Sequence, residues 1–261
     1  FFSIFAIAAI LIGLNGIPMA ANAALVTPSE LEAGDLIRGE TLSAVYYYGA
    51  DGFRYVFPSS DVYFSWYDDF DTVKWLSDVD LGKVQIGGNA TYKPGSWLVK
   101  INTDPKTYAV DENATLRWVT SEAVALETYG ANWNTKVRDV PDAFWSNYNF
   151  GSDVESGDDY DADEALANID DIDEDKELQA PYVIMLGDSG YDSSEYTVDA
   201  GRAVKFLNNG TDTHTATADD LTWGTGTIQP GENFSKYFDE AGSYPFKCSY
   251  HPSVTATLIV E

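Results

Sequence analysis

Short segments of alternating character, separated by turn residues, fill the last third of the chain and restrict the fold that it can adopt. Six such segments, YVIML, EYTV, AVKFL, NFSKYF, SYPFKC and TATLIV, lie between residues 182 and 260. Asn-Gly, Pro-Gly and Ala-Gly steps separate several of them. Many short strands with regularly spaced turns are typical of an antiparallel sandwich. The sequence therefore predicts a Greek-key β-sandwich over residues 181–261, in a chain that is mostly β.

The only two histidines and the only cysteine of the chain all lie within this predicted sandwich. Cys248 and His251 stand three residues apart in the loop after a predicted strand, and His214 follows another strand. Cys248 has the strand parity of Tyr244 and Phe246, so its sulfur is expected to point into the apolar interior. Two imidazoles and one thiolate form the trigonal ligand set of blue copper sites. A single cysteine also excludes an intrachain disulfide.

Three stretches around these residues resemble the plastocyanin/amicyanin-type cupredoxins. They are NGTDTH at 209–214, IQPGENF at 228–234 and AGSYPFKCSYHPSV at 241–254. The resemblance covers roughly residues 182–261. It implies a type 1 copper domain with His214, Cys248 and His251 as the metal ligands, and electron transfer to a redox partner protein. It also implies a hydrogen bond from the Thr215 backbone N–H to the Cys248 sulfur.

One position departs from the cupredoxin pattern. In amicyanin-like spacing an axial methionine comes three residues after the second histidine, and here that residue is Val254. Valine cannot ligate, so a bound copper would keep three ligands or recruit a carbonyl or water, and its reduction potential would rise. The departure leaves two alternatives open: a domain that keeps only the fold, and a site for another metal such as zinc.

An apolar run opens the printed sequence and predicts a secreted or cell-surface protein. Residues 1–12 read FFSIFAIAAILI, and no charged residue comes before Glu30. The run is too short and interrupted for a membrane span, whereas Ala-Asn-Ala at 21–23 is typical of a signal-peptide cleavage site. An apolar helix after an initial phenylalanine also resembles type IV pilin-like proteins, although Phe5 stands where bacterial pilins commonly have an acidic residue. Residues 1–23 are therefore expected to be a signal or an assembly helix. In the second case the alternative function is that of a structural subunit of an extracellular filament or surface layer, which self-associates into a homopolymer through this segment.

The region between these two parts is expected to hold a connector and an α+β domain. Residues 24–44 form the predicted connector. Residues 45–152 are rich in tyrosine and tryptophan, and Asp-Gly at 51–52 separates two strand-like segments, as in a tight hairpin. RYV at 54–56 is matched by RWV at 117–119, and each is followed by a serine-containing helix start. The pattern predicts two hairpin-plus-helix repeats.

Residues 153–180 are expected to be an acidic linker, either solvated or with a helix of modest stability. Positions 153–177 hold 13 Asp or Glu and a single lysine, Lys176, and charges of one sign at this density repel. Aspartates alternate at 159–163 and again at 171–175, which resembles the start of calcium loops. Neither run has the glycine or the final glutamate of such a loop, so a solvated charge run is the main interpretation and calcium the alternative.

Composition excludes several function classes. The net charge of −27 with only 15 Lys and Arg argues against binding nucleic acid or an anionic membrane surface. Neither a third histidine for a catalytic triad nor a G-x-S-x-G motif is present. We therefore expect a non-catalytic protein, an electron carrier or a structural subunit.

Overall fold

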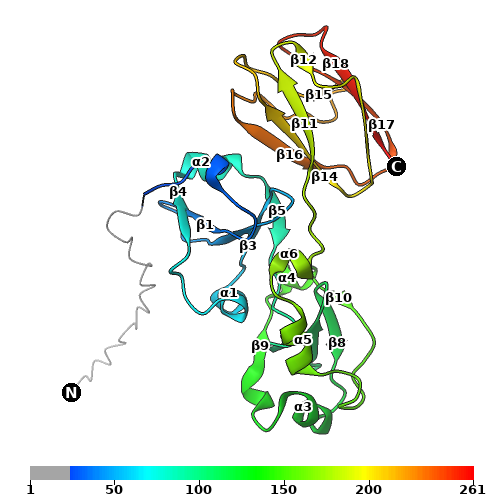
Figure 1. The fold of residues 1–261 in the computed structure, drawn as a ribbon. Coiled ribbons are helices and arrows are strands. Elements are labelled where there is room, and N and C mark those ends of the chain that lie inside the picture. Colours follow the sequence, from blue (N-terminus) through cyan, green and yellow to red (C-terminus); the bar gives the residue numbers. More distant parts are fainter. Residues whose placement is uncertain (1–23) are drawn as a thin grey trace, which may run out of the picture.

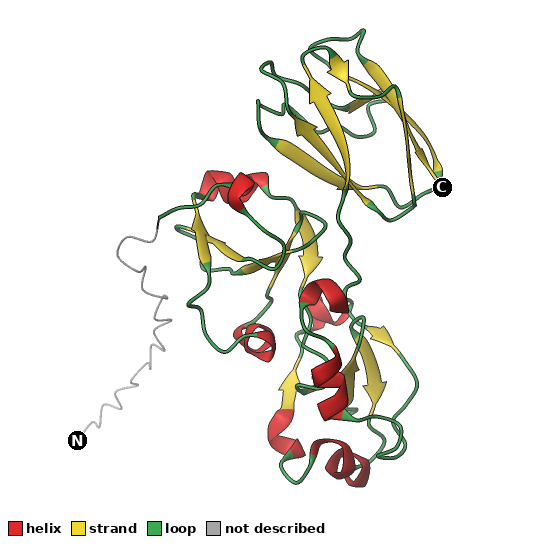
Figure 2. Ribbon diagram, viewed as in Figure 1, coloured by secondary structure: helices red, strands yellow, loops and turns green. Residues whose placement is uncertain are grey.

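The computed structural model describes residues 24–261, so the signal or assembly helix predicted over residues 1–23 lies outside the described range. The described chain forms four sheets in three groups: two five-stranded sheets, each with its own helices, and a pair of four-stranded sheets at the C-terminal end. Figure 2 shows that the helices belong to the N-terminal part, and that the C-terminal part is built of strands and loops. None of the helices within residues 24–261 has the length and apolarity needed to cross a bilayer.

The first five-stranded sheet has the strand order β4-β1-β2-β3-β5 (Figure 1). Its elements are the 3-10 helix η1 (Pro28–Glu30), β1 (Leu36–Gly39), β2 (Tyr46–Tyr48), β3 (Arg54–Val56), α1 (Ser60–Trp66), β4 (Lys74–Leu76), α2 (Asp78–Lys83) and β5 (Ile86–Asn89).

The second five-stranded sheet has the order β10-β8-β7-β6-β9. Its elements are β6 (Leu98–Lys100), β7 (Tyr108–Asp111), β8 (Thr115–Trp118), α3 (Glu122–Tyr129), η2 (Trp133–Lys136), β9 (Val137–Asp139), α4 (Asp142–Trp145) and β10 (Asn149–Phe150).

These two sheets are built alike. In each, an antiparallel three-stranded meander is followed by a helix, and two later strands add in parallel to the outer edges. The helices after the meanders start as predicted, because the Ser59 and Ser121 side chains accept hydrogen bonds from the N–H of Val62 and Val124. The predicted hairpin-plus-helix units are thus part of two similar, larger sheets.

The predicted connector over residues 24–44 needs a correction. Its residues 36–39 form β1, which pairs with both β2 and β4 in the first sheet. Leu36 and Ile37 are both buried, one on each face. Polar residues flank this short apolar pair, so the segment resembled a linker. The strand β4, with which it pairs, lies more than thirty residues later in the chain.

The acidic segment is also folded rather than a solvated linker. It contains α5 (Ala162–Asn168) and α6 (Ile172–Asp175), and its apolar residues Val154, Tyr160 and Ile172 are buried against the two sheets. The aspartates at 161 and 171 accept hydrogen bonds from the first N–H groups of these helices, where negative charge is favourable. Within residues 24–261 no acidic cluster with metal-binding geometry forms here, so the calcium alternative gains no support.

The C-terminal part consists of two four-stranded sheets, ordered β12-β11-β14-β16 and β13-β18-β17-β15. Its strands are β11 (Tyr182–Gly187), β12 (Gly190–Tyr191), β13 (Glu195–Val198), β14 (Ala203–Asn208), β15 (Thr217–Ala218), β16 (Asn233–Tyr237), β17 (Gly242–Lys247) and β18 (Thr255–Val260). The six segments predicted from sequence are all strands. Two pairs, β11–β14 and β13–β18, are parallel, against the expected antiparallel arrangement.

A buried carboxylate joins the C-terminal sheets to the first five-stranded sheet. Asp51 is 1% exposed and accepts hydrogen bonds from the hydroxyls of Tyr55 and, across the interface, Tyr237. The Tyr237 ring also stacks on Phe53, with 4.8 Å between ring centroids. Burial raises the pKa of Tyr237, which keeps its hydroxyl protonated as a donor. The two parts of the molecule therefore share a packed, hydrogen-bonded interface.

Candidate metal centre

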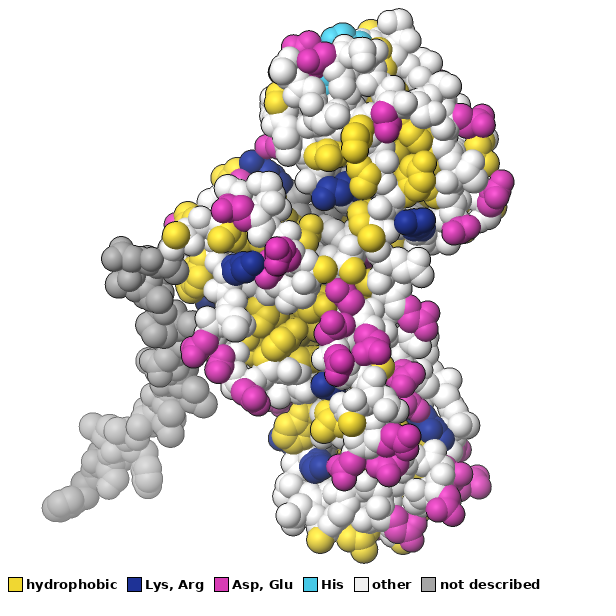
Figure 3. Space-filling model, viewed as in Figure 1, with side chains coloured by type: hydrophobic (Ala, Val, Ile, Leu, Met, Phe, Trp, Pro, Cys, Tyr) yellow, Lys and Arg dark blue, Asp and Glu magenta, His cyan; other side chains and the backbone are white. Residues whose placement is uncertain are grey.

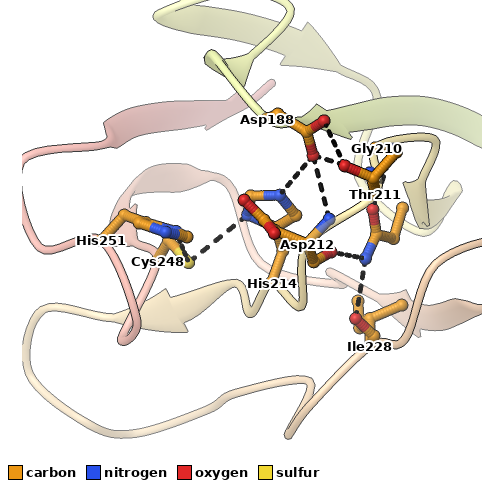
Figure 4. Close-up of polar contacts among 9 residues, drawn as sticks. Asp188, Gly210, Thr211, Asp212, His214, Ile228, Cys248 and His251 are labelled. Carbon is orange, nitrogen blue, oxygen red and sulfur yellow. Dashed lines mark hydrogen bonds and ion pairs between the residues drawn. The ribbon is translucent and has the colours of Figure 1, made fainter.

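His214, Cys248 and His251 converge in the C-terminal sheets. The Cys248 Sγ atom lies 3.7 Å from Nδ1 of His214 and 3.6 Å from Nδ1 of His251, although His214 is 34 residues away along the chain. One ligand atom from each of the three side chains fits within 4.8 Å of the others. Figure 4 shows the three side chains facing one another. Within residues 24–261 they are the only group of His, Cys, Asp or Glu side chains with metal-binding geometry.

These separations fit a single metal ion. Bond lengths of about 2.0–2.1 Å to nitrogen and about 2.3 Å to sulfur, at angles of roughly 110–120°, place the two donor atoms about 3.6–3.8 Å apart. The observed sulfur–nitrogen distances lie within this range. The geometry can therefore hold an ion that prefers one soft sulfur and two imidazole nitrogens.

The loop that carries two of these residues is a closed turn. Cys248 follows directly after β17, and its N–H donates to the carbonyl oxygen of Val254 at 3.0 Å. Within the turn, the Val254 N–H donates to the His251 carbonyl oxygen at 2.8 Å, and the His251 N–H donates to that of Cys248 at 3.2 Å. Backbone bonds thus fix the spacing of the Cys-x-x-His pair, so the loop holds its shape through its own main chain.

His214 is held from the opposite side of the site. Its N–H and carbonyl group exchange hydrogen bonds with Ile228, at 3.2 and 2.9 Å, and the side-chain amide of Asn208 donates to the Ile228 carbonyl oxygen at 2.8 Å. His214 and Cys248 are buried, at 2% and 0% exposure, whereas His251 is half-buried. The site therefore reaches solvent on the side of His251.

The predicted bond from the Thr215 N–H to the Cys248 sulfur does not occur among the hydrogen bonds of the described residues. Thr215 instead accepts from the Ser249 N–H through its side-chain oxygen, at 2.7 Å. Its carbonyl oxygen accepts from the hydroxyl of Tyr191 at 2.8 Å. Burial, followed by the nearby Cys248 sulfur, raises the pKa of Tyr191. Thr215 thus contacts the start of the loop that carries Cys248 and His251 through its side-chain oxygen, and not through its N–H group as expected.

Val254 occupies the position after His251 where an axial methionine was expected, and it packs closely. The Cβ atom that Gly190 lacks would lie 3.3 Å from one methyl group of Val254 and 3.7 Å from the other. The sulfur of Met185 lies against the side chain of Asn209. Val254 therefore lies against Gly190, and its own side chain has no atom that could bind a metal.

Asp188 is a neighbour of the site that the sequence did not reveal. Its carboxylate Oδ1 lies 3.8 Å from Nε2 of His214. Hydrogen bonds from the N–H of Asp212 and from the hydroxyl and N–H of Thr211 hold the pKa of Asp188 below its ordinary value. Asp188 lies in the turn at residues 187–190, and the pairing of β11 with β14 brings this turn beside His214.

Comparison with known proteins relates the C-terminal part of the chain to a protein family. The model of the family described as "Cupredoxin-like domain" matches residues 165–260. The match begins inside the acidic segment, ahead of the predicted start at residue 181, and the domain boundaries predicted from sequence stay predictions. A search of curated proteins finds no match.

Solved structures of cupredoxins and of a copper-containing enzyme are similar to part of this chain. A purple cupredoxin from Nitrosopumilus maritimus is 19% identical, with 31% of this chain and 99% of that chain covered and a TM-score of 0.29. An oxidised variant of amicyanin is 25% identical, covering 31% and 81%, at a TM-score of 0.29. A Cu-containing nitrite reductase from Thermus scotoductus is 20% identical, covering 32% and 23%, at a TM-score of 0.31. The C-terminal part of this chain therefore matches the cupredoxin-like domain family over residues 165–260.

Proposed function

We propose that the cupredoxin-like domain binds one copper ion as a type 1 centre and serves as a non-catalytic electron carrier. The convergence of the Cys248 sulfur with one Nδ1 atom from each of His214 and His251 supports this function most strongly. A thiolate with two imidazoles suits both Cu(I) and Cu(II), and this ligand set is typical of blue copper electron-transfer sites. Copper bound there would supply a one-electron couple.

The residues around the site support a carrier because they hold the ligands in place. The turn hydrogen bonds fix Cys248 and His251, and the bridge to Ile228 fixes His214. Ligands that keep their positions reduce the rearrangement that accompanies a change of metal charge. A preorganised site of this kind favours electron transfer over chemistry that needs a new bond to the metal.

His251 is the ligand through which electrons would reach a partner protein. It is half-buried while the other two ligands are buried. Tyr250, next to it, is 52% exposed. In Figure 3 the visible histidine surface lies at the end of the C-terminal domain that points away from the five-stranded sheets. A redox partner could therefore approach this end without touching the rest of the chain.

Titration of the purified protein with Cu(II) tests this function. We expect one equivalent to produce an intense visible absorption band from thiolate-to-copper charge transfer, and Cys248→Ser to remove it. Ser253→Ala, a change at an exposed position of the same loop, should leave the band in place. Copper uptake without the band, or a band that survives in Cys248→Ser, would contradict a type 1 site. Uptake of zinc with no copper band would support the alternative metal.

A further inference from the structure

The second ring nitrogen of His214 makes no hydrogen bond within residues 24–261. Its Nδ1 atom faces the Cys248 sulfur, whereas its Nε2 atom is buried and, among the described residues, makes no hydrogen bond. A buried polar atom without a hydrogen-bond partner is destabilising. The nearby carboxylate is that of Asp188, whose Oδ1 atom lies 3.8 Å away, slightly beyond hydrogen-bond distance. Figure 4 shows Asp188 on the side of the imidazole ring opposite Cys248.

Asp188 is hydrogen-bonded to the segment that leads to His214. The N–H and hydroxyl groups of Thr211 donate to its carboxylate at 2.7 and 2.8 Å, and the N–H of Asp212 donates at 3.0 Å. These hydrogen bonds join the turn between β11 and β12 to the chain just before His214.

Gly210 makes room for this approach. A Cβ atom at Gly210 would lie 2.3 Å from Oδ1 of Asp188 and 3.0 Å from its backbone nitrogen. Any other residue at position 210 would therefore push the carboxylate away. Together with the three donors, this arrangement holds the exposed side chain of Asp188 beside the buried ring of His214.

We propose that Asp188 is a positioning residue that accepts the Nε2–H of His214 and thereby leaves Nδ1 free of a proton and directed at the metal. A movement of about 1 Å would bring the pair to the 2.7–2.9 Å of a charge-assisted hydrogen bond. Metal-binding histidines generally donate their other N–H to a neighbouring group, which fixes the tautomer and ring orientation. This role rests on the proposed copper site, but the choice of tautomer is a property of the metal-free protein as well.

Two consequences follow for a bound copper ion. The acceptor makes His214 a better donor to the metal, and removal of such an outer hydrogen bond typically lowers metal affinity by about 10–100-fold. The negative charge of Asp188 also favours Cu(II) over Cu(I), because the ion with the higher charge gains more from a nearby carboxylate. Without it, the reduction potential should rise.

Asp188→Asn tests this role, with Asp220→Asn as the matched control. Asp220 belongs to the same domain and likewise accepts from the N–H and hydroxyl of a threonine, Thr222, and its substitution removes an equal charge. The first readout is nitrogen NMR of the imidazole rings in the metal-free protein at about pH 8, where an ordinary imidazole is neutral. We expect His214 of the wild type and of Asp220→Asn to be in the Nε2–H form, and Asp188→Asn to mix both tautomers.

The second readout is copper binding measured against a competing chelator, together with the reduction potential. We expect Asp188→Asn to lower Cu(I) affinity at least about tenfold. We also expect it to lower the ratio of Cu(II) to Cu(I) affinity by about tenfold, which corresponds to a rise of about 59 mV. Asp220→Asn should change neither quantity by more than about twofold, as expected for an exposed charge that salt and solvent screen.

The outcomes separate the two hypotheses. If the wild type binds copper and Asp188→Asn keeps the wild-type tautomer, affinity and potential, the role of Asp188 is wrong and the copper site stands. If the wild type takes up no copper but its tautomer changes in Asp188→Asn, the copper function is wrong and the positioning role stands. Equal effects of both variants would assign the change to net charge alone, and would overturn the role of Asp188.

Discussion

The backbone N–H of Cys248 donates to the carbonyl oxygen of Val254 at 3.0 Å, so the sulfur-bearing residue is tied to the residue at the expected axial position. Val254 is therefore part of the frame of the site, although its side chain has no ligating atom. A change of its side chain alone should leave this backbone bond intact. The axial position can thus be tested without removing any of the three candidate ligands.

Val254→Met should lower the reduction potential of the copper-loaded protein. A thioether at the axial position stabilises Cu(II), and the identity of the axial ligand tunes the potential of such sites. The measurement is a redox titration followed in the visible band. Val254→Leu is the matched control, since leucine has a similar volume and cannot ligate. Equal shifts in both variants would show that packing against Gly190, not a new ligand, causes the change.

Asp175 should make the protein less stable as the pH rises from about 4 to 6. Burial raises the pKa of this carboxyl group to about 6 in the folded state, above its ordinary value of 3.8. The folded state therefore binds more protons than the unfolded state within this window, and stability falls through it by about 2 kcal/mol. Urea unfolding of the wild type and of Asp175→Asn, at about pH 4.5 and about pH 8, on either side of the folded-state pKa, measures the difference.

Asp175→Asn should remove this part of the pH dependence. The asparagine side chain can still accept the hydrogen bond from the Asn113 N–H without placing a charge in the interior. The variant should thus be at least as stable as the wild type at the higher pH. Asp158→Asn, at an exposed position of the same segment, should keep the wild-type pH profile. An Asp175→Asn protein that is clearly less stable than the wild type at the higher pH would contradict this account.

The hydrogen bond between Asp51 and Tyr237 should couple the cupredoxin-like domain to the first sheet. Asp51→Ala leaves the hydroxyls of Tyr55 and Tyr237 without their acceptor, and the protein is expected to be destabilised by about 2–5 kcal/mol. We expect calorimetry to show the domain unfolding separately in this variant. Tyr244→Phe removes a hydroxyl that bonds only within its own domain, to Glu240, and should keep a single transition. A single transition at wild-type temperature in Asp51→Ala would show that this interface does not couple the two parts.

The three candidate ligands were predictable because histidine and cysteine are rare in this chain. With two histidines and one cysteine in total, a Cys-x-x-His loop and a second histidine after another strand left few ways to build a site. The strands around them were predictable for a similar reason, since their alternation and turns are local features. The segment predicted at residues 255–260, for example, coincides with β18.

Features that depend on pairing between distant segments were not predictable. Asp188 comes close to His214 only through the pairing of β11 with β14, and nothing local to residue 188 indicates that neighbour. The acidic segment was misinterpreted because its charge density outweighed its few apolar residues. Val154, Tyr160 and Ile172 are enough to fold it against the two sheets.

X-ray absorption at the copper edge of the loaded protein tests the central claim most directly. The claim is that one sulfur and two imidazole nitrogens, from Cys248, His214 and His251, surround the same ion. We predict one short copper–sulfur bond and two copper–nitrogen bonds per copper in the wild type, and no copper–sulfur bond in Cys248→Ser. A copper ion surrounded by oxygen donors without sulfur would contradict the account and leave the domain without its proposed electron-transfer site.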